Sequence, residues 1–371
     1  MKNSAPPPHV QVAIAEFLSD PSQWGISLSG TGAVYRLERK FASLVGLPHA
    51  LAVTNATLGL WAVFMALEIH DAEVITTPYT WGGTLAGLLL TGNRPVFADI
   101  DAQTLTLDPE KVVLCITSRT RAILAVDIYG YPADGPALRK IADRHGLVLI
   151  QDCAQSFGAY RGENHTGWWA DVAVFSFTWG KALFAGEGGL ILTRHPELWE
   201  RLVWETQHPH RQLRDVPDLP ANEIAMNLRI HPLSAVWADA SFDQALAGME
   251  EHRDECVQIL NLLEKEQMSR TKVPDGQRVK PSFHTLTFEP RCDPGKIERL
   301  LQESKMPYQL CSPPIIEPLY RHESYRKASL LNGWDRPDRR PAAERQFRRR
   351  LRLVKSNVSP RPSSSESHQE P

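Results

Sequence analysis

The sequence predicts an α/β fold in which a mostly parallel sheet lies between two layers of helices. Short apolar, β-branched runs recur along the first half of the 371-residue chain, and segments with helical spacing separate most of them. Runs that are apolar on both faces are typical of a covered parallel sheet, and their alternation with helices indicates a doubly wound arrangement. The expected strands are 50–55, 73–78, 94–100, 122–130, 147–154, 171–177 and 188–193, and the clearest helices are 58–69 and 136–146.

Informative side chains gather at one edge of this predicted sheet. In sheets of this kind the ligand binds at the carboxyl ends of the strands. The residues that follow the strands there are Thr54, Asn55, Ala56, Thr57, Thr80, Trp81, Asp152, Gln155 and Ser176, with Lys181 just beyond. The sequence therefore predicts a binding site at this edge.

The pattern changes from about residue 232. A long helix over 232–267 is followed by an expected strand at 281–290, a helix at 296–305 and an extended segment at 307–314, which together indicate a smaller α+β domain. The expected organisation is an N-terminal arm (1–23), a large α/β domain (24–245), a small C-terminal domain (246–327) and a tail (328–371). Because the tail is rich in Arg, Pro and Ser, we expect it to be largely disordered.

Composition narrows the function classes. Hydrophobic residues make up 42% and charged residues 23% of the chain, and the net charge is -2, which gives no overall attraction to nucleic acid or membrane. No apolar signal core or membrane-length run is seen, so the cytoplasm is the expected location. Five scattered cysteines without CxxC spacing argue against a disulfide framework or a structural zinc site. The histidines 208 and 210 are interpreted as a solvated loop, and no metal is expected.

Two residues suggest an aldehyde cofactor. Such a cofactor needs a lysine that can be neutral to form an imine, and a carboxylate that faces the pyridine nitrogen. Asp152 ends an apolar strand, where burial would be costly without a cationic partner such as a pyridinium. Lys181 precedes a glycine-rich turn at 185–189. Taken singly, the aspartate is better explained as a helix cap and the lysine as a solvated loop residue, but together their order and the glycine turn favour pyridoxal phosphate.

A phosphate site is expected where the first strand meets its helix. A helix start offers free N–H groups to an anion, and Asn55, Ala56 and Thr57 stand there. The alternative is an ordinary helix cap that uses Asn55 or Thr57. Trp81 is a candidate to cover one face of a flat ring, with a core or surface role as its alternative. No Walker lysine motif or GxGxxG element supports a nucleotide fold.

Six motifs occur in the order typical of one family. They are TNATLGL, DAEVITTPYTWGGT, RPVFADID, DIYGYPADGPALRKIADRHGLVLIQDCAQSFGA, FSFTWGKALFAGEGGLILT and MNLRIHPLSA. Over roughly residues 24–325 the chain resembles the DegT/StrS family of sugar and secondary-metabolite aminotransferases. The resemblance implies a fold-type-I pyridoxal-phosphate enzyme, usually a homodimer with active sites shared between subunits.

The resemblance also implies a role for each matching residue. Lys181 would bear pyridoxal 5'-phosphate and Asp152 would pair with its pyridinium, while Gln155 and Trp81 would lie on opposite faces of the ring. Ala56, Thr57 and Ser176 would bind the phosphate, which Asn227 would reach from the partner subunit. Arg229 would help to bind a substrate carboxylate.

The chain departs from the family pattern at three places. Asn55-Ala56-Thr57 stands where Ser-Gly-Thr is usual, and Trp169 stands where small residues are common. Residues 328–371 do not resemble the strand and helix that usually close the small domain, which indicates a domain that is truncated or altered.

These roles imply transfer of an amino group from glutamate or glutamine to a keto-sugar or keto-cyclitol, in the biosynthesis of sugars, polysaccharides or secondary metabolites. A lysine at 181, where dehydratases of the family carry histidine, favours transfer. The alternatives are a dehydratase of this family, a cofactor-binding pseudoenzyme, and a regulatory protein that uses the basic residues of the tail, although no nucleic-acid or membrane partner is expected. The acceptor itself cannot be read from the sequence.

Overall fold

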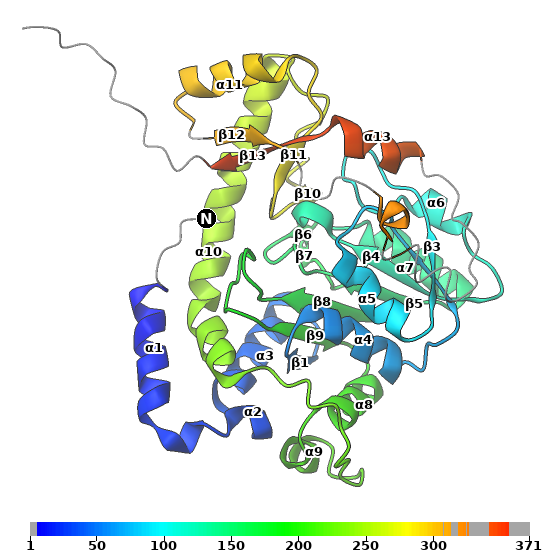
Figure 1. Cartoon of the computed structure of the whole chain (residues 1–371), viewed down its shortest axis with the longest axis vertical. Helices are drawn as coiled ribbons and strands as arrows, with labels where there is room; N and C mark the ends of the chain where they lie inside the picture. Colours follow the sequence, from blue (N-terminus) through cyan, green and yellow to red (C-terminus); the bar gives the residue numbers. More distant parts are fainter. Residues whose placement is uncertain (1–5, 307, 313–317, 324, 326–340, 356–371) are drawn as a thin grey trace, which may run out of the picture.

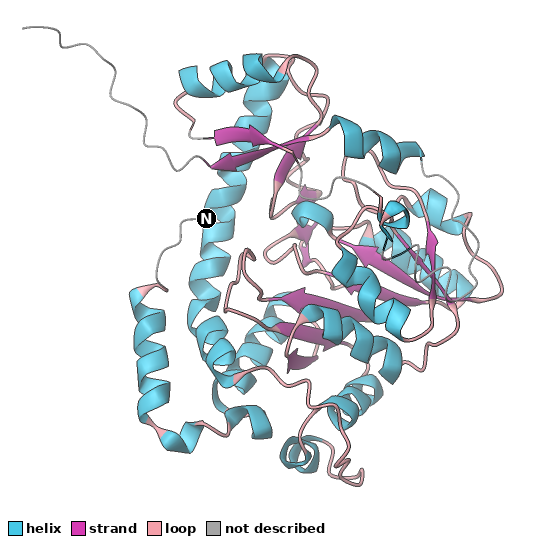
Figure 2. Cartoon of the chain, viewed as in Figure 1, coloured by secondary structure: helices cyan, strands magenta, loops and turns pink. Residues whose placement is uncertain are grey.

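The computed structural model describes residues 6–306, 308–312, 318–323, 325 and 341–355. Within these residues, a seven-stranded sheet with the order β1-β9-β8-β5-β4-β2-β3 is covered by helices on both faces (Figures 1 and 2). Its strands are β1 (His49–Val53), β2 (Glu73–Thr76), β3 (Arg94–Phe97), β4 (Thr120–Val126), β5 (Val148–Asp152), β8 (Val172–Ser176) and β9 (Gly189–Thr193). β9 runs antiparallel to both of its neighbours, and the pairs from β8 to β3 are parallel. The predicted fold class is confirmed.

Several helices begin at an N-cap residue, whose side chain accepts a hydrogen bond from the first turn. Asn55, Asp108, Asp134 and Asp293 each accept a hydrogen bond from a backbone N–H of the first turn. The helices that flank the large sheet are α2 (Ile26–Ser29), α3 (Gly32–Val45), α4 (Ala56–Ala66), α5 (Gly82–Leu90), α6 (Pro109–Val113), α7 (Gly135–His145), α8 (Pro196–Thr206) and α9 (Pro209–Asp215). α1 (Pro8–Ser19) packs along α10 (Pro232–Lys265), and short 3₁₀ turns lie at Pro21–Gln23, Ile128–Gly130 and Leu319–Arg321.

Alternate residues of the strands bury against different helices. Ala173 and Phe175 of β8 pack with α3 and α10, whereas Val172 and Val174 pack with α4 and α8 on the other face. This alternation follows from the pleat, which points successive side chains to opposite faces. Because both faces are covered, the strands carry apolar residues at nearly every position. No helix in the described part of the chain is long and apolar enough to cross a membrane.

The C-terminal region packs around the far end of α10. There β11 (Leu286–Phe288), β13 (Leu351–Lys355) and β12 (Tyr308–Cys311) form a small antiparallel sheet covered by α11 (Pro294–Glu303). A second small sheet joins β10 (Val279–Lys280), β6 (Tyr160–Arg161) and β7 (Asn164–His165). The domain boundary expected at residue 245 falls inside the continuous helix α10, and the division into domains stays a prediction.

Part of the expected tail is folded. Residues 341–355 form α13 (Pro341–Arg349) and β13, which is the middle strand of the small sheet. Composition suggested disorder because arginine dominates the segment, yet Ala343 and Leu353 are buried and β13 pairs on both sides. The rest of the expected tail, 328–340 and 356–371, lies outside the described residues.

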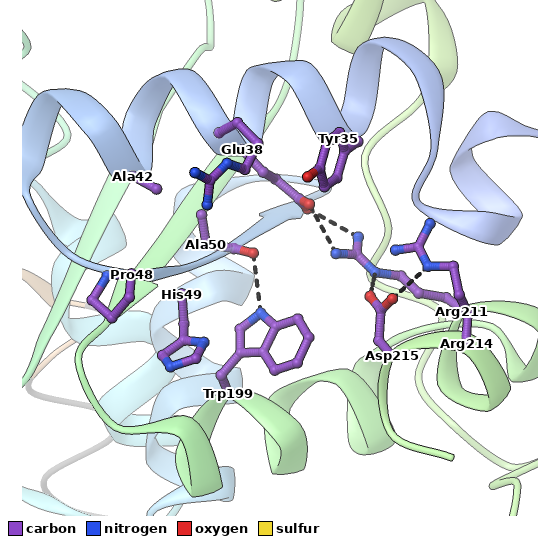
Figure 3. Close-up of a pocket in the computed structure, with 11 residues that line it drawn as sticks. Tyr35, Glu38, Ala42, Pro48, His49, Ala50, Trp199, Arg211, Arg214 and Asp215 are labelled. Atoms are coloured by element: carbon purple, nitrogen blue, oxygen red, sulfur yellow. Dashed lines mark hydrogen bonds and ion pairs between the residues drawn. The ribbon is translucent and has the colours of Figure 1, made fainter.

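A buried ion pair fixes α3 to α9 beside a pocket of about 220 Å³ (Figure 3). Glu38 accepts two hydrogen bonds of 2.9 Å from the Arg211 guanidinium and one of 2.7 Å from the amide of Ala52. Asp215 accepts a further bond of 3.0 Å from Arg211. Glu38 and Asp215 are thus both paired with Arg211. We therefore interpret this wall of the pocket as a structural contact that holds α3 and α9 against β1.

We expect Glu38→Gln to lower the free energy of unfolding by about 3 kcal/mol, because it leaves a buried guanidinium short of one negative charge. Urea unfolding of the variant and the wild type gives this difference. Glu197→Gln on α8, whose side chain is 76% exposed, is the matched control and should change the value by less than about 0.5 kcal/mol. Equal effects of the two substitutions would contradict a structural role for the pair.

His165 gives the fold a defined acid sensitivity. Burial lowers the pKa of its imidazole to about 4, and the ring accepts a hydrogen bond from the amide of Gly158. Between pH 4 and the unfolded value of about 6.5, the unfolded chain binds more protons at this group, so its contribution to stability is lost as the pH falls. We expect a loss of about 3 kcal/mol across that window. As the pH is lowered from 7 to 4.5, the free energy of unfolding should therefore fall less steeply in His165→Gln than in the wild type, and parallel curves would reject the assignment.

Candidate active site

Two strand ends bring the first candidate residues to one edge of the large sheet. Asp152 ends β5 and Ser176 ends β8, and these two strands are parallel neighbours. The Asp152 carboxylate is 6% exposed. Its Oδ2 accepts a hydrogen bond of 2.7 Å from the Thr84 hydroxyl, and its Oδ1 accepts one of 3.0 Å from the amide of Ala154. These bonds fix the orientation of the carboxylate, and no cationic side chain among the described residues is hydrogen-bonded to it.

Lys181 lies in the turn between β8 and β9, close enough to Asp152 for the two charges to interact. Burial lowers the pKa of the Lys181 ammonium, and the Asp152 carboxylate opposes that shift. Burial likewise raises the pKa of Asp152, against the hydrogen bonds from Thr84 and Ala154 and the charge of Lys181. A lysine that is more easily neutral is suited to attack a carbonyl. A buried carboxylate that lacks a cationic hydrogen-bond partner is suited to a ligand that supplies one.

Gln155 and Trp81 flank the same edge. The Gln155 side-chain oxygen accepts a hydrogen bond of 2.7 Å from the amide of Tyr129. Trp81 precedes α5 and is 64% exposed, so its ring has an open face. A Cβ added at Gly83 would meet the Thr57 hydroxyl at 2.9 Å and the Trp81 ring at 3.3 Å. Thr57, Trp81 and Gly83 therefore line the same space.

Strand β9 connects the start of α4 to the end of β8, because one of its residues contacts both. Gly189 of β9 pairs with Ser176, and a Cβ added at Gly189 would come within 2.6 Å of the Ala56 amide nitrogen. Ala56, Thr57 and Ser176 therefore lie together at the N-terminus of the 11-residue helix α4, which is the positive end of its dipole. Asn55 fills the role given by its alternative interpretation, since its Oδ1 caps the helix at the amide of Leu58 at 2.8 Å.

Within one chain, Asn227 and Arg229 lie beside the end of β1, next to the segment that leads into α4. Both lie in the loop before α10, where Leu228 accepts a hydrogen bond of 2.7 Å from Thr54 and Arg229 bridges to Val53 of the edge strand β1. Asn227 is exposed and accepts a hydrogen bond of 2.5 Å from the Arg229 guanidinium. Its backbone adopts a left-handed φ of 54°.

Three side chains at this edge were not singled out from the sequence. Thr84 orients Asp152, and the buried Asp127 accepts hydrogen bonds from Gln151, from Ser156 and from the amide of Ala133. His284 lies near Lys181, and burial and the lysine charge lower its pKa to about 3. The only local signals were the Thr-x-x-x-Thr spacing at 80–84 and a second aspartate after an apolar strand.

The loop that carries His284 is fastened to the site. Ser282 donates its hydroxyl hydrogen bond of 3.1 Å to the carbonyl of Gln155, and its amide donates one of 2.9 Å to Gly130. Elsewhere, His208 and His210 are not in a loop as expected: His208 caps α9, His210 lies in its first turn, and their rings meet edge to face with centroids 4.7 Å apart. In the residues the structure describes, no group of three or more His, Cys, Asp or Glu side chains is arranged to hold a metal ion.

The model of the DegT/DnrJ/EryC1/StrS aminotransferase family matches residues 18–344, most of the chain. The chain belongs to this family. The resemblance found in its motifs is thereby confirmed.

Solved members of this family have the same fold. A DegT/DnrJ/EryC1/StrS aminotransferase from Brucella abortus is 22% identical, with a TM-score of 0.79 over 94% of this chain and 90% of that one. DesI, solved in the presence of its TDP-sugar product, is 26% identical, with a TM-score of 0.75 over 95% and 86%. NtdA of Bacillus subtilis, with the bound cofactor PMP, is 18% identical, with a TM-score of 0.76 over 95% and 78%.

Proposed function

We propose that this protein is a pyridoxal-phosphate aminotransferase that moves an amino group from glutamate or glutamine to a keto-sugar or keto-cyclitol. The observation that carries the proposal is the pair formed by the partly buried Lys181 and the buried Asp152, each of which acts on the pKa of the other. Membership of the aminotransferase family and the TDP-sugar product of DesI support the reaction and the class of acceptor.

The described residues fit the cofactor. Lys181 would hold it covalently, Asp152 would face the ring nitrogen, and Trp81 and Gln155 would contact the two faces of the ring. Ala56, Thr57 and Ser176 would bind the phosphate at the start of α4. When bound, pyridoxal phosphate supplies an electron sink for a carbanion at the donor's α-carbon.

Lys181 has a second role once its nitrogen is free. Its amine would take the proton from the donor's α-carbon as a general base and deliver it to C4′ of the cofactor as a general acid, and it would move a proton in the opposite direction during the second half of the reaction. Asp152, held by Thr84 and Ala154, would keep its charge beside the ring nitrogen throughout. Arg229 would bind a substrate carboxylate. The lysine at 181 supports transfer over dehydration, which remains the alternative for this family.

The test is a spectrum followed by a half-reaction. Purified protein with added pyridoxal phosphate should show the visible band of a lysine-bound cofactor. Glutamate or glutamine alone should then remove the band and release one keto acid for each site. Absence of the band, or a band that no donor affects, would contradict an active transferase. Loss of water from a keto-sugar without amino transfer would select the dehydratase.

The proposal includes a homodimer and a cytoplasmic location. Asn227 would reach the phosphate of the partner subunit, and two features support this: its own exposure to solvent, and the exposed apolar residues beside it. Ile224 is 91% exposed and Met226 is 56% exposed, as expected for residues that a second copy covers.

We expect Ile224→Asp to shift the protein from dimer to monomer in light scattering and to weaken cofactor binding, because Asn227 would lose its partner site. Val12→Asp on α1, with a 56% exposed side chain, is the matched control and should leave the dimer intact. A wild-type monomer that binds the cofactor tightly would contradict the shared site.

A further inference from the structure

The helix α13 packs directly behind the candidate active site. Ala343 of α13 is fully buried in a hydrophobic cluster that includes Tyr79 and Tyr129. The two tyrosine rings lie edge to face with centroids 5.9 Å apart. Tyr129 donates its amide hydrogen bond to Gln155, and Tyr79 begins the segment that leads to Trp81. A helix near the C-terminus thus packs against Tyr129, which is bonded to Gln155, and against Tyr79, which lies two residues before Trp81.

A carboxylate from the large sheet fixes the start of this helix. Asp99, two residues after β3, accepts a hydrogen bond of 2.9 Å from the amide of Ala342 and another of 2.9 Å from the amide of Ala343. A cap of this kind fixes where a helix begins and how it is directed. The position of Ala343 in the tyrosine cluster therefore depends on Asp99.

A buried arginine fixes the other end. Arg350 is 3% exposed, and each of its side-chain nitrogens donates to a neutral oxygen. The acceptors are Gln346 at 2.9 Å, the Thr287 carbonyl and hydroxyl at 3.3 and 3.2 Å, and the carbonyls of Ala102 and Gln103 at 2.9 and 3.1 Å. The guanidinium thus joins α13, the small sheet and the loop after β3. Only a forked, multiply donating side chain can make this set of bonds.

We propose that Arg350 and Asp99 are positioning residues for the active site. They clamp α13 so that the tyrosine pair holds Gln155 and Trp81 in place for the cofactor. Thr80 adds a second route, because its hydroxyl shares a hydrogen bond of 2.8 Å with Thr84, which in turn holds Asp152. The inference rests on the proposed function only for the identity of the ligand, since the clamp itself is a property of the protein alone.

The test compares Arg350→Met with Arg349→Met, a neighbour whose side chain is 57% exposed. Hydrogen exchange at the Tyr129 amide is measured without cofactor, and the affinity for pyridoxal phosphate is measured well below the unfolding temperature. We expect Arg350→Met to speed exchange roughly tenfold and to weaken cofactor binding about tenfold, with Arg349→Met unchanged. Asp99→Asn should change both quantities in the same direction, and it carries the comparison if Arg350→Met does not fold.

Two results would overturn the inference. One is an Arg350→Met protein that melts earlier but keeps the Tyr129 exchange rate and the cofactor affinity within twofold, which is a purely structural role. The other is equal effects of the Arg349 and Arg350 substitutions. If the wild type takes up no pyridoxal phosphate, the proposed function fails. Hydrogen exchange at the Tyr129 amide in the wild type and the variants still decides whether the clamp exists.

Discussion

Replacing Lys181 with alanine should remove the visible band of lysine-bound cofactor and lower amino transfer by at least about 10³-fold. The substitution deletes both the nitrogen that attacks the cofactor's carbonyl and the base that moves the proton at the donor's α-carbon, and a positioned base alone is worth about 10²–10⁴-fold. Because Lys181 lies in a turn and its charge opposes burial, we expect the fold to survive.

The measurement combines an absorbance spectrum with a donor-only half-reaction. Lys140→Ala, an exposed lysine on α7, is the matched control and should behave as the wild type. If Lys181→Ala kept the band at full intensity, another lysine would carry the cofactor. If it lost the band but kept the rate, Lys181 would not be the base.

The large sheet could be predicted because its strands carry their own signal. Each of the seven apolar runs expected for the large sheet overlaps a strand of the structure, and Asp152 and Ser176 stand at strand ends as expected. The order of the strands and the antiparallel direction of β9 could not be predicted, because pairing between distant runs leaves no local pattern. The expected strand at 281–290 is confined to Leu286–Phe288, because the residues before it dock against Gly130 and Gln155.

The rest of the site depends on contacts between segments that are remote in sequence. Thr84 is 68 residues from Asp152, and His284 reaches Lys181 only after the chain has crossed into the small sheet. The helix α13 and the strand β13 could not be predicted because their segment is rich in arginine. Composition alone does not show that Arg350 is buried and hydrogen-bonded. The role proposed for Asn227 requires a second subunit, so it stays a prediction from the resemblance.

Replacing Asp152 with asparagine should lower amino transfer by about 10²–10³-fold while the covalent attachment to Lys181 is retained. Asparagine keeps the shape of the side chain but cannot stabilise a protonated ring nitrogen. Removing one charge from a buried ion pair costs about 3–5 kcal/mol, and each 1.36 kcal/mol on a barrier is tenfold in rate. The loss should appear in the rate of proton removal from the donor's α-carbon, measured by stopped flow with glutamate.

Asp127→Asn is the matched control for this substitution. Asp127 is as buried as Asp152 and follows the neighbouring strand β4, but its oxygens accept bonds from Gln151, Ser156 and Ala133. We therefore expect its replacement to reduce the stability of the protein and to leave the rate of proton removal within about tenfold of the wild type, since a lost hydrogen bond is worth roughly 1 kcal/mol. The reverse result, a fast Asp152→Asn protein beside a slow Asp127→Asn protein, would mean that the ring nitrogen faces Asp127. In that case the cofactor would lie one strand away from the position that Lys181 and Thr84 define.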